Sequence, residues 1–132
     1  GIKDYIEKTL HKARSDNYVE TILGRRRSVW DINSENALKR QAAERIAINM
    51  PIQGSAAELI KIAMIEVQKE IEKKSLKSKM ILQIHDELLF EYPIEEKDIL
   101  VSMVKNSMEN AMKLKVPIIV DYGFGKNWYE AH

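Results

Sequence analysis

Residues 80–92, MILQIHDELLFEY, are the stretch around which the fold can be built. Two runs rich in strand-forming residues flank a compact polar centre of His85, Asp86 and Glu87. This pattern predicts a β-hairpin with acid groups at its bend. Adjacent carboxylates repel each other and lose hydration when they are buried, so the bend should meet water, basic partners or a metal ion. The hairpin is therefore the first candidate for chemistry.

The composition fits one globular domain, because 45% of the 132 residues are hydrophobic and such a chain can build a core. The absence of cysteine excludes disulfides, thiolate nucleophiles and cysteine-based zinc sites, and it agrees with a cytoplasmic location. The net charge of +1 gives no global argument for binding nucleic acid or membrane, so only local clusters could do so. A helical pattern starts directly after Gly1, and we expect a soluble fragment of a larger protein.

The apolar spacing predicts an α+β fold, with a small antiparallel sheet that carries the hairpin and packs against amphipathic helices. Helices are expected over residues 2–16, 34–50, 55–74 and 95–113. Besides the central hairpin, short strands are expected over residues 18–23, 28–32 and 118–122. The first two of these strands enclose a basic tip at residues 24–27, GRRR.

Several boundaries can be predicted from single residues. Asn33 or Ser34 can cap the second helix. Pro51 and Gly54 predict a kink or break before the third helix, whose polar side, opposite the apolar stripe, includes Glu58. The aromatic residues near the C-terminal end, Trp128 and Tyr129, are expected to anchor the tail.

The acid pair at the hairpin bend has two open interpretations. Asp86 and Glu87 could bind Mg²⁺, a hard cation that takes carboxylate oxygens, or they could form a polar turn. His85 could contact a substrate phosphate or a nucleic-acid backbone, or it could make a structural hydrogen bond. We assign no function to His11 or to His132.

Two polar groups could contact nucleic acid. Three guanidinium groups in the basic tip suit bidentate phosphate contacts, with a solvated loop as the alternative. Three polar residues four apart, which we call the helix row, could read base edges or sugars in a minor groove, or could form an ordinary polar face. The tip contributes Arg25, Arg26 and Arg27, and the helix row is Arg45, Asn49 and Gln53.

Four sequence blocks occur in a fixed order and together cover essentially the whole chain. They are YVET with GRRR at 18–27, AER with NMPIQGSAAE at 43–58, LQIHDEL at 82–88 and GKNW at 125–128. These blocks resemble the C-terminal part of the polymerase domain of family A DNA polymerases, the bacterial DNA polymerase I family. In that family residues 1–33 would lead from the fingers, and residues 34–132 would belong to the palm.

The resemblance implies roles for the candidate residues. The hairpin would be motif C of the palm, with Asp86 as one of two aspartates that hold catalytic Mg²⁺ ions and Glu87 in support. Two-metal phosphoryl transfer would add deoxynucleotides to a primer 3′ end in DNA replication and repair. His85 would lie near the primer terminus, and the helix row would touch template and primer near the newly formed pair.

The resemblance also implies partners and limits. Primer-template DNA and dNTP would be the partners, at the nucleoid in a bacterial cytoplasm. The second metal-binding aspartate belongs to motif A, which does not occur here, nor do the thumb or exonuclease domains. We therefore expect this chain alone to be inactive, and it could self-associate through exposed apolar patches. A non-catalytic nucleic-acid-binding module and a small metal-dependent hydrolase remain as alternative functions.

Overall fold

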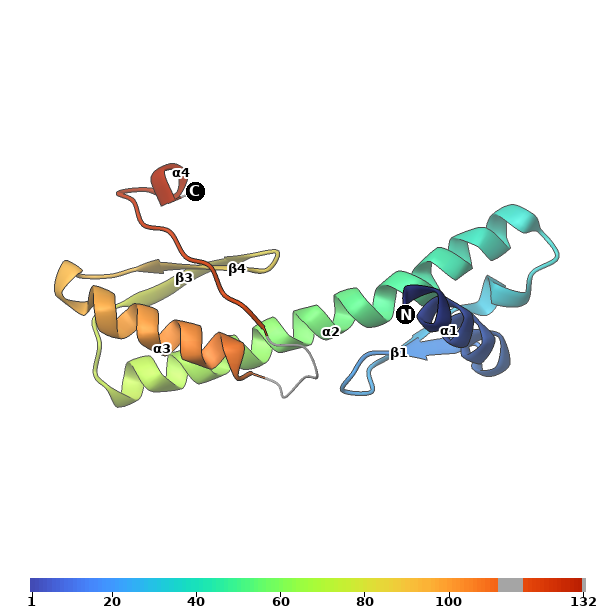
Figure 1. Ribbon diagram of the computed structural model, residues 1–132, viewed down its shortest axis with the longest axis horizontal. Coiled ribbons are helices and arrows are strands. Elements are labelled where there is room, and N and C mark those ends of the chain that lie inside the picture. Colours follow the sequence, from blue (N-terminus) through green and yellow to red (C-terminus); the bar gives the residue numbers. More distant parts are fainter. Residues whose placement is uncertain (112–117, 132) are drawn as a thin grey trace. The chain divides into compact units, whose positions relative to one another are not determined.

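The structure is a computed structural model that describes residues 1–111 and 118–131 (Figure 1). The chain divides into two compact units, Gly1–Glu58 and Leu59–His132. Helix α2 (Ala37–Lys73) contributes residues to both units. The expected α+β class is confirmed, because two antiparallel hairpins accompany the helices in the described part of the chain.

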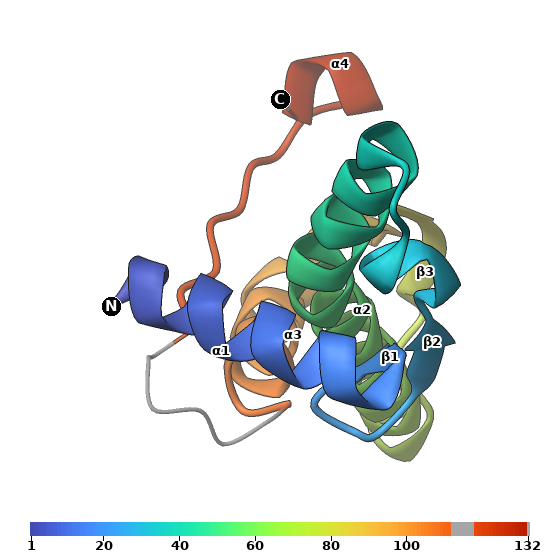
Figure 2. The same ribbon diagram turned by 90° about the vertical axis from the view of Figure 1, so that its right-hand side faces the viewer.

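In the first unit, α1 (Ile2–Asp16) lies beside a hairpin formed by β1 (Tyr18–Glu20) and β2 (Arg26–Ser28), as Figure 2 shows. The helix ends as expected, at Asn17, whose φ of 60° is the left-handed conformation common after helices. Both strands are shorter than expected. Arg26 and Arg27 lie in β2 rather than in a tip, because the 3₁₀-helix η1 (Trp30–Asn33) takes up the residues expected to be extended.

A small apolar core joins these elements. Alanines on α1 and α2 permit close approach of the helices, and β-branched residues from the hairpin and η1 fill the space between them. Its buried members are Ala13, Val19, Val29, Ile32, Ala43 and Ala47.

The start of α2 differs from the expectation. Asn36 caps the helix, because its Oδ1 accepts hydrogen bonds from the N–H groups of Leu38 (3.0 Å) and Lys39 (3.2 Å). Asn33 instead belongs to η1, where its side chain donates a hydrogen bond to the Arg14 carbonyl (2.9 Å). The helix begins later than predicted because this contact engages the expected cap elsewhere.

Of the kink or break expected at Pro51 and Gly54, the break does not occur, since α2 runs through both residues as one helix. A proline inside a helix costs about 3 kcal/mol, because it removes a hydrogen bond and its ring crowds the preceding turn. The Tyr5 hydroxyl donates a hydrogen bond to the Ile48 carbonyl (3.1 Å) in that turn. Ala47 and Ile60 are buried on either side of the proline, and such burial offsets the local loss.

In the second unit, β3 (Lys79–Ile84) and β4 (Glu87–Glu91) form the predicted central hairpin. Ile84 pairs with Glu87, which leaves His85 and Asp86 as a two-residue bend. The short η2 (Ile94–Glu96) and the helix α3 (Lys97–Glu109) follow. The last two residues of the helix expected over 95–113 lie outside the described residues.

The core of the second unit lies between α3 and the end of α2, which run side by side in Figure 1. The apolar stripe predicted for this part of α2 is confirmed. The buried members of this core are Val67, Ile71, Leu100 and Met103, and Leu76, Phe90, Tyr92 and Val104 pack against them.

The C-terminal segment corrects two expectations. Residues 118–122 do not form a strand, because no described strand pairs with them. Tyr129, in α4 (Trp128–Ala131), is 91% exposed, so it does not anchor the tail. Phe124 anchors this segment: its ring packs edge-on against Tyr92 at a centroid distance of 6.0 Å and lies 4.1 Å from the Lys97 Nζ.

One carboxylate ties the start of β3 to η2. Glu96 accepts hydrogen bonds from the N–H of Lys77 (2.8 Å), the N–H of Ser78 (2.9 Å) and the Ser78 hydroxyl (2.8 Å). The hydrogen bond from the Lys77 N–H is the main cause that lowers the pKa of the Glu96 carboxyl below its ordinary 4.5. Loss of hydration raises this pKa, and the hydrogen bonds from Ser78 lower it further.

The lowered pKa predicts a pH-dependent contribution of Glu96 to stability. The contribution is complete above pH 4.5 and disappears as the pH falls through the folded-state pKa. Glu96→Gln should therefore lower the thermal midpoint at neutral pH, and its difference from wild type should shrink on acidification. Thermal unfolding followed by circular dichroism checks this, with the exposed neighbour Glu95→Gln as the control. A difference that is constant with pH would contradict it.

Candidate nucleic-acid groove and acid hairpin

Six candidate residues from separate parts of the first unit line one surface groove of about 820 Å³. The helix row comes from successive turns of α2, as its spacing predicted. The arginines come from β2 and the residue before it. The polar members are Arg25, Arg26, Arg27, Arg45, Asn49 and Gln53, and the remaining lining residues are Ala42, Ile46, Met50, Gly54 and Ala57. The groove is therefore largely apolar where α2 forms it, with cationic and amide groups around it.

The three arginines of the basic tip have different surroundings. The Arg25 Nε lies 3.6 Å from the Glu58 Oε1. The Arg26 Nε pairs with the Glu20 Oε1 at 3.1 Å, and its guanidinium lies 4.3 Å from the centre of the Tyr18 ring. Within residues 1–111 and 118–131, no ion pair involves Arg27.

Glu58 corrects the expectation that it lies on a solvated face, because only 7% of this residue is exposed. Its Oε1 accepts a hydrogen bond from the Thr21 hydroxyl (2.5 Å), and its Oε2 accepts one from the Leu23 N–H (3.3 Å). These donors compensate for the hydration that the carboxylate loses. Sequence reasoning missed this residue, since a glutamate at a polar helix position gives no local indication of burial.

Gly54 permits this contact between α2 and the end of β1. A Cβ on this residue would lie 2.6 Å from the Thr21 Cγ2 and 3.3 Å from an Arg25 guanidinium nitrogen. The Thr21 side chain cannot easily rotate away, because Glu58 holds its hydroxyl. Although glycine is unfavourable inside a helix, it is required at this position by the close packing against Thr21.

The acid hairpin belongs to the second unit, where His85, Asp86 and Glu87 are exposed at the bend. His85 has a φ of 52°, an uncommon backbone conformation for a residue with a side chain. The Gln83 amide donates a hydrogen bond to the His85 carbonyl. Among the described residues no three His, Asp or Glu side chains are grouped as metal ligands, so the bend alone does not form a closed metal site.

Comparisons with known proteins identify the family. A profile of DNA polymerase family A matches residues 1–130. The chain belongs to DNA polymerase family A. The DNA polymerase I of Caldicellulosiruptor bescii is 52% identical over 129 residues, which are 98% of this chain and 15% of that protein. The DNA polymerase I of Lactococcus lactis subsp. lactis is 50% identical over 131 residues, 99% of this chain and 15% of that protein.

A solved structure gives the same result for the family A fold. The POL domain of Pol1 from M. smegmatis, in complex with DNA primer-template and dNTP, superposes with a TM-score of 0.94 at 46% identity. The match covers 98% of this chain and 23% of that one. The chain thus spans about 15% of the length of the relatives named above.

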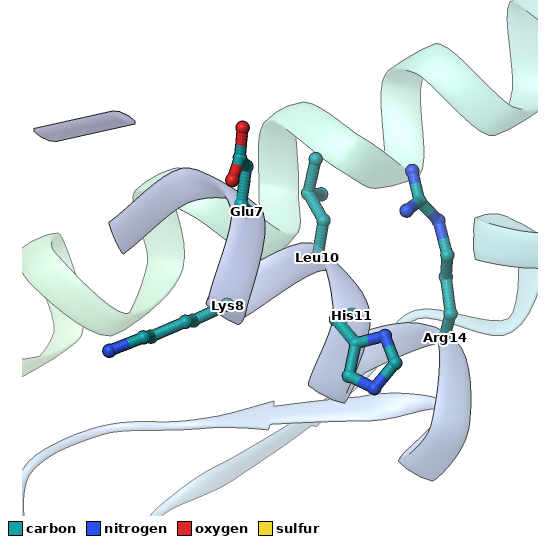
Figure 3. A pocket seen from close by; sticks show the side chains of 5 residues that line it. All are labelled: Glu7, Lys8, Leu10, His11 and Arg14. Carbon is teal, nitrogen blue, oxygen red and sulfur yellow. The ribbon is translucent and has the colours of Figure 1, made fainter. Parts of the chain in front are cut away.

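A second surface depression of the family A chain lies on α1, with a volume of about 580 Å³ (Figure 3). Its lining side chains spread apart rather than converge on one point, and the Arg14 guanidinium lies 3.4 Å from Glu44. They are Glu7, Lys8, Leu10, His11 and Arg14. None of the helices in the described residues is long and apolar enough to cross a membrane.

We predict that Gly54→Ala destabilises this family A chain by about 1–2 kcal/mol. The added methyl group meets Thr21, and this overpacking exceeds the gain of up to about 1 kcal/mol that alanine brings to a helix. Chemical denaturation measures the difference. Thr21→Ser removes the opposing Cγ2 while it keeps the hydroxyl, so the double variant should regain stability relative to Gly54→Ala. A stabilised single variant would contradict the packing argument.

Proposed function

We propose that this chain is part of a DNA-directed DNA polymerase that adds deoxynucleotides to a primer 3′ end during DNA replication and repair. The observation that carries the proposal is the groove, in which six of the seven candidate DNA-binding residues lie together. Membership in family A supports the reaction class. The partners would be primer-template DNA and dNTP, which the M. smegmatis domain binds. Residues 1–33 would lead from the fingers, and residues 34–132 would form palm.

The groove has the chemistry to hold a duplex end without reading its sequence. Guanidinium groups donate hydrogen bonds to phosphates, and phosphate contacts carry no sequence information. Arg45, Asn49 and Gln53 can donate to minor-groove acceptors, which occupy similar positions in every correct base pair. Such a row would test pairing geometry near the newly formed pair. His85, the seventh residue, would lie near the primer terminus.

The acid hairpin would supply ligands for Mg²⁺. The Asp86 and Glu87 carboxylates are hard oxygen donors at an exposed bend, which suits this cation, and we assign Asp86 as the ligand with Glu87 in support. Bound Mg²⁺ would supply charge stabilisation for attack of the primer hydroxyl on the α-phosphate and for departure of pyrophosphate. The described residues contain no group of three such ligands, and an aspartate of motif A would supply a further one.

We predict that Asp86→Ala in the full-length polymerase lowers primer extension by on the order of a thousandfold, because the barrier rises by several kcal/mol when a metal ligand is lost. Binding of primer-template DNA should persist, since the groove lies in the other unit. Single-turnover extension and fluorescence anisotropy measure the two properties. Glu91→Gln, an exposed carboxylate of the same hairpin, is the control. Normal turnover in Asp86→Ala would remove this residue from the metal site.

We also predict that the 132-residue chain by itself does not extend a primer in the presence of Mg²⁺. One carboxylate pair cannot easily hold two ions against both substrates. The groove should still confer DNA affinity that decreases with salt and needs no metal. A primer-extension assay and a salt titration check both statements. Templated incorporation by this chain would refute the incomplete-site argument, and binding without turnover in the full-length protein would favour the non-catalytic module.

A further inference from the structure

We propose that Glu58 is a positioning residue for the arginines of the groove, an inference that rests on the proposed function. Glu58 does not line the groove, although Gly54 and Ala57 of the same helix do. It is buried, and it contacts the connection between β1 and β2 from which these arginines extend. Its carboxylate would therefore act on DNA binding through the arginines.

The connection is closed by a ring of hydrogen bonds centred on Thr21. The Thr21 hydroxyl donates to Glu58 and accepts from the Arg25 N–H (3.1 Å). The Thr21 N–H donates to the Arg25 carbonyl (2.9 Å), and the Gly24 N–H donates to the Thr21 carbonyl (2.9 Å). The Leu23 N–H completes the set on the second carboxylate oxygen. The hydrogen bonds among residues 21–25 fix the turn, and the two bonds to Glu58 attach the turn to α2.

The attachment includes a second contact one turn earlier on the helix. The Ser55 Oγ accepts a hydrogen bond from the Ile22 N–H (2.9 Å). Gly54 leaves room for Thr21 at the same level. A buried carboxylate without its donors is strongly disfavoured, so the turn has little freedom to move while Glu58 stays in place.

The ion pairs of the three arginines indicate which guanidinium is available to phosphate. Arg25 forms an ion pair with Glu58, and Arg26 forms an ion pair with Glu20. Arg27 has no ion pair among the described residues and follows the ring by two positions, opposite Val19 in β1. We therefore assign the main phosphate contact among the three arginines to Arg27. Glu58 would position the Arg27 guanidinium by fixing the turn that precedes this residue in the chain.

The test is the salt dependence of primer-template binding by the full-length polymerase, measured with Thr21→Val, Glu58→Gln and Arg27→Ala. Arg27→Ala should reduce the slope of log K against log salt concentration by about 1. Thr21→Val and Glu58→Gln should reduce it similarly and raise the Kd about tenfold, while kcat at saturating DNA falls far less. Adding Arg27→Ala to Glu58→Gln should have little further effect, because the contact is already lost.

Matched variants separate positioning from instability. Thr21→Ser keeps the hydroxyl and should keep the wild-type slope. Glu66→Gln removes an exposed carboxylate that pairs with Lys69 at 3.6 Å on the same helix, and it should bind DNA as wild type does. Partial unfolding lowers the active fraction without changing the slope, so a changed slope reports on the contact itself.

The outcomes distinguish the two proposals. If the wild-type protein extends a primer but Thr21→Val and Glu58→Gln keep the wild-type slope and Kd, the positioning role of Glu58 is wrong and the proposed function stands. If Arg27→Ala leaves the slope unchanged while Arg25→Ala lowers it, the assignment of the phosphate contact is wrong. If the wild-type protein does not extend a primer, the proposed function fails and this inference fails with it.

Discussion

The continuity of α2 through Pro51 is the constraint on which the groove depends. Gln53 follows Arg45 and Asn49 along the groove because the helix continues past the proline. Glu58 reaches Thr21 for the same reason. The loss at the proline is local and amounts to about 3 kcal/mol, whereas apolar burial accumulates along the helix at roughly 25 cal/mol per Å². Burial therefore outweighs this loss, and the helix continues through the proline between residues that line the groove.

Local patterns predicted those parts of the fold that local forces determine. The helix over residues 2–16 follows from its apolar spacing, and the central hairpin follows from two strand-forming runs around a polar bend. The predictions were wrong where the local structure depends on a residue or strand that is distant in the sequence. Asn36 caps α2 because Asn33 contacts α1. Residues 118–122 have strand-forming side chains, but a strand also needs a neighbour that pairs with it.

The same distinction applies to the groove. Spacing of four residues places the helix row on one face, and this much could be predicted. Composition could not reveal that Arg25, Arg26 and Arg27 have different partners, because Glu58 lies 37 positions from the threonine it contacts. Charge counting treats three adjacent arginines as equal, whereas their ion pairs in the folded chain make them unequal. The difference between the surroundings of the three arginines thus arises from the tertiary structure.

The bend of the acid hairpin departs from local preference in a way that bears on its role. A two-residue bend with positive φ at its first position favours glycine, since a Cβ in that conformation costs roughly 1–2 kcal/mol. His85 occupies this position with a φ of 52°, and the carbonyl of the same residue is held by Gln83. Such strain persists where a side chain is needed for another purpose. The hairpin and Gln83 therefore hold the backbone of His85 in a conformation that local preference alone does not select, whereas the proposed place of its imidazole at the primer terminus is a separate assignment.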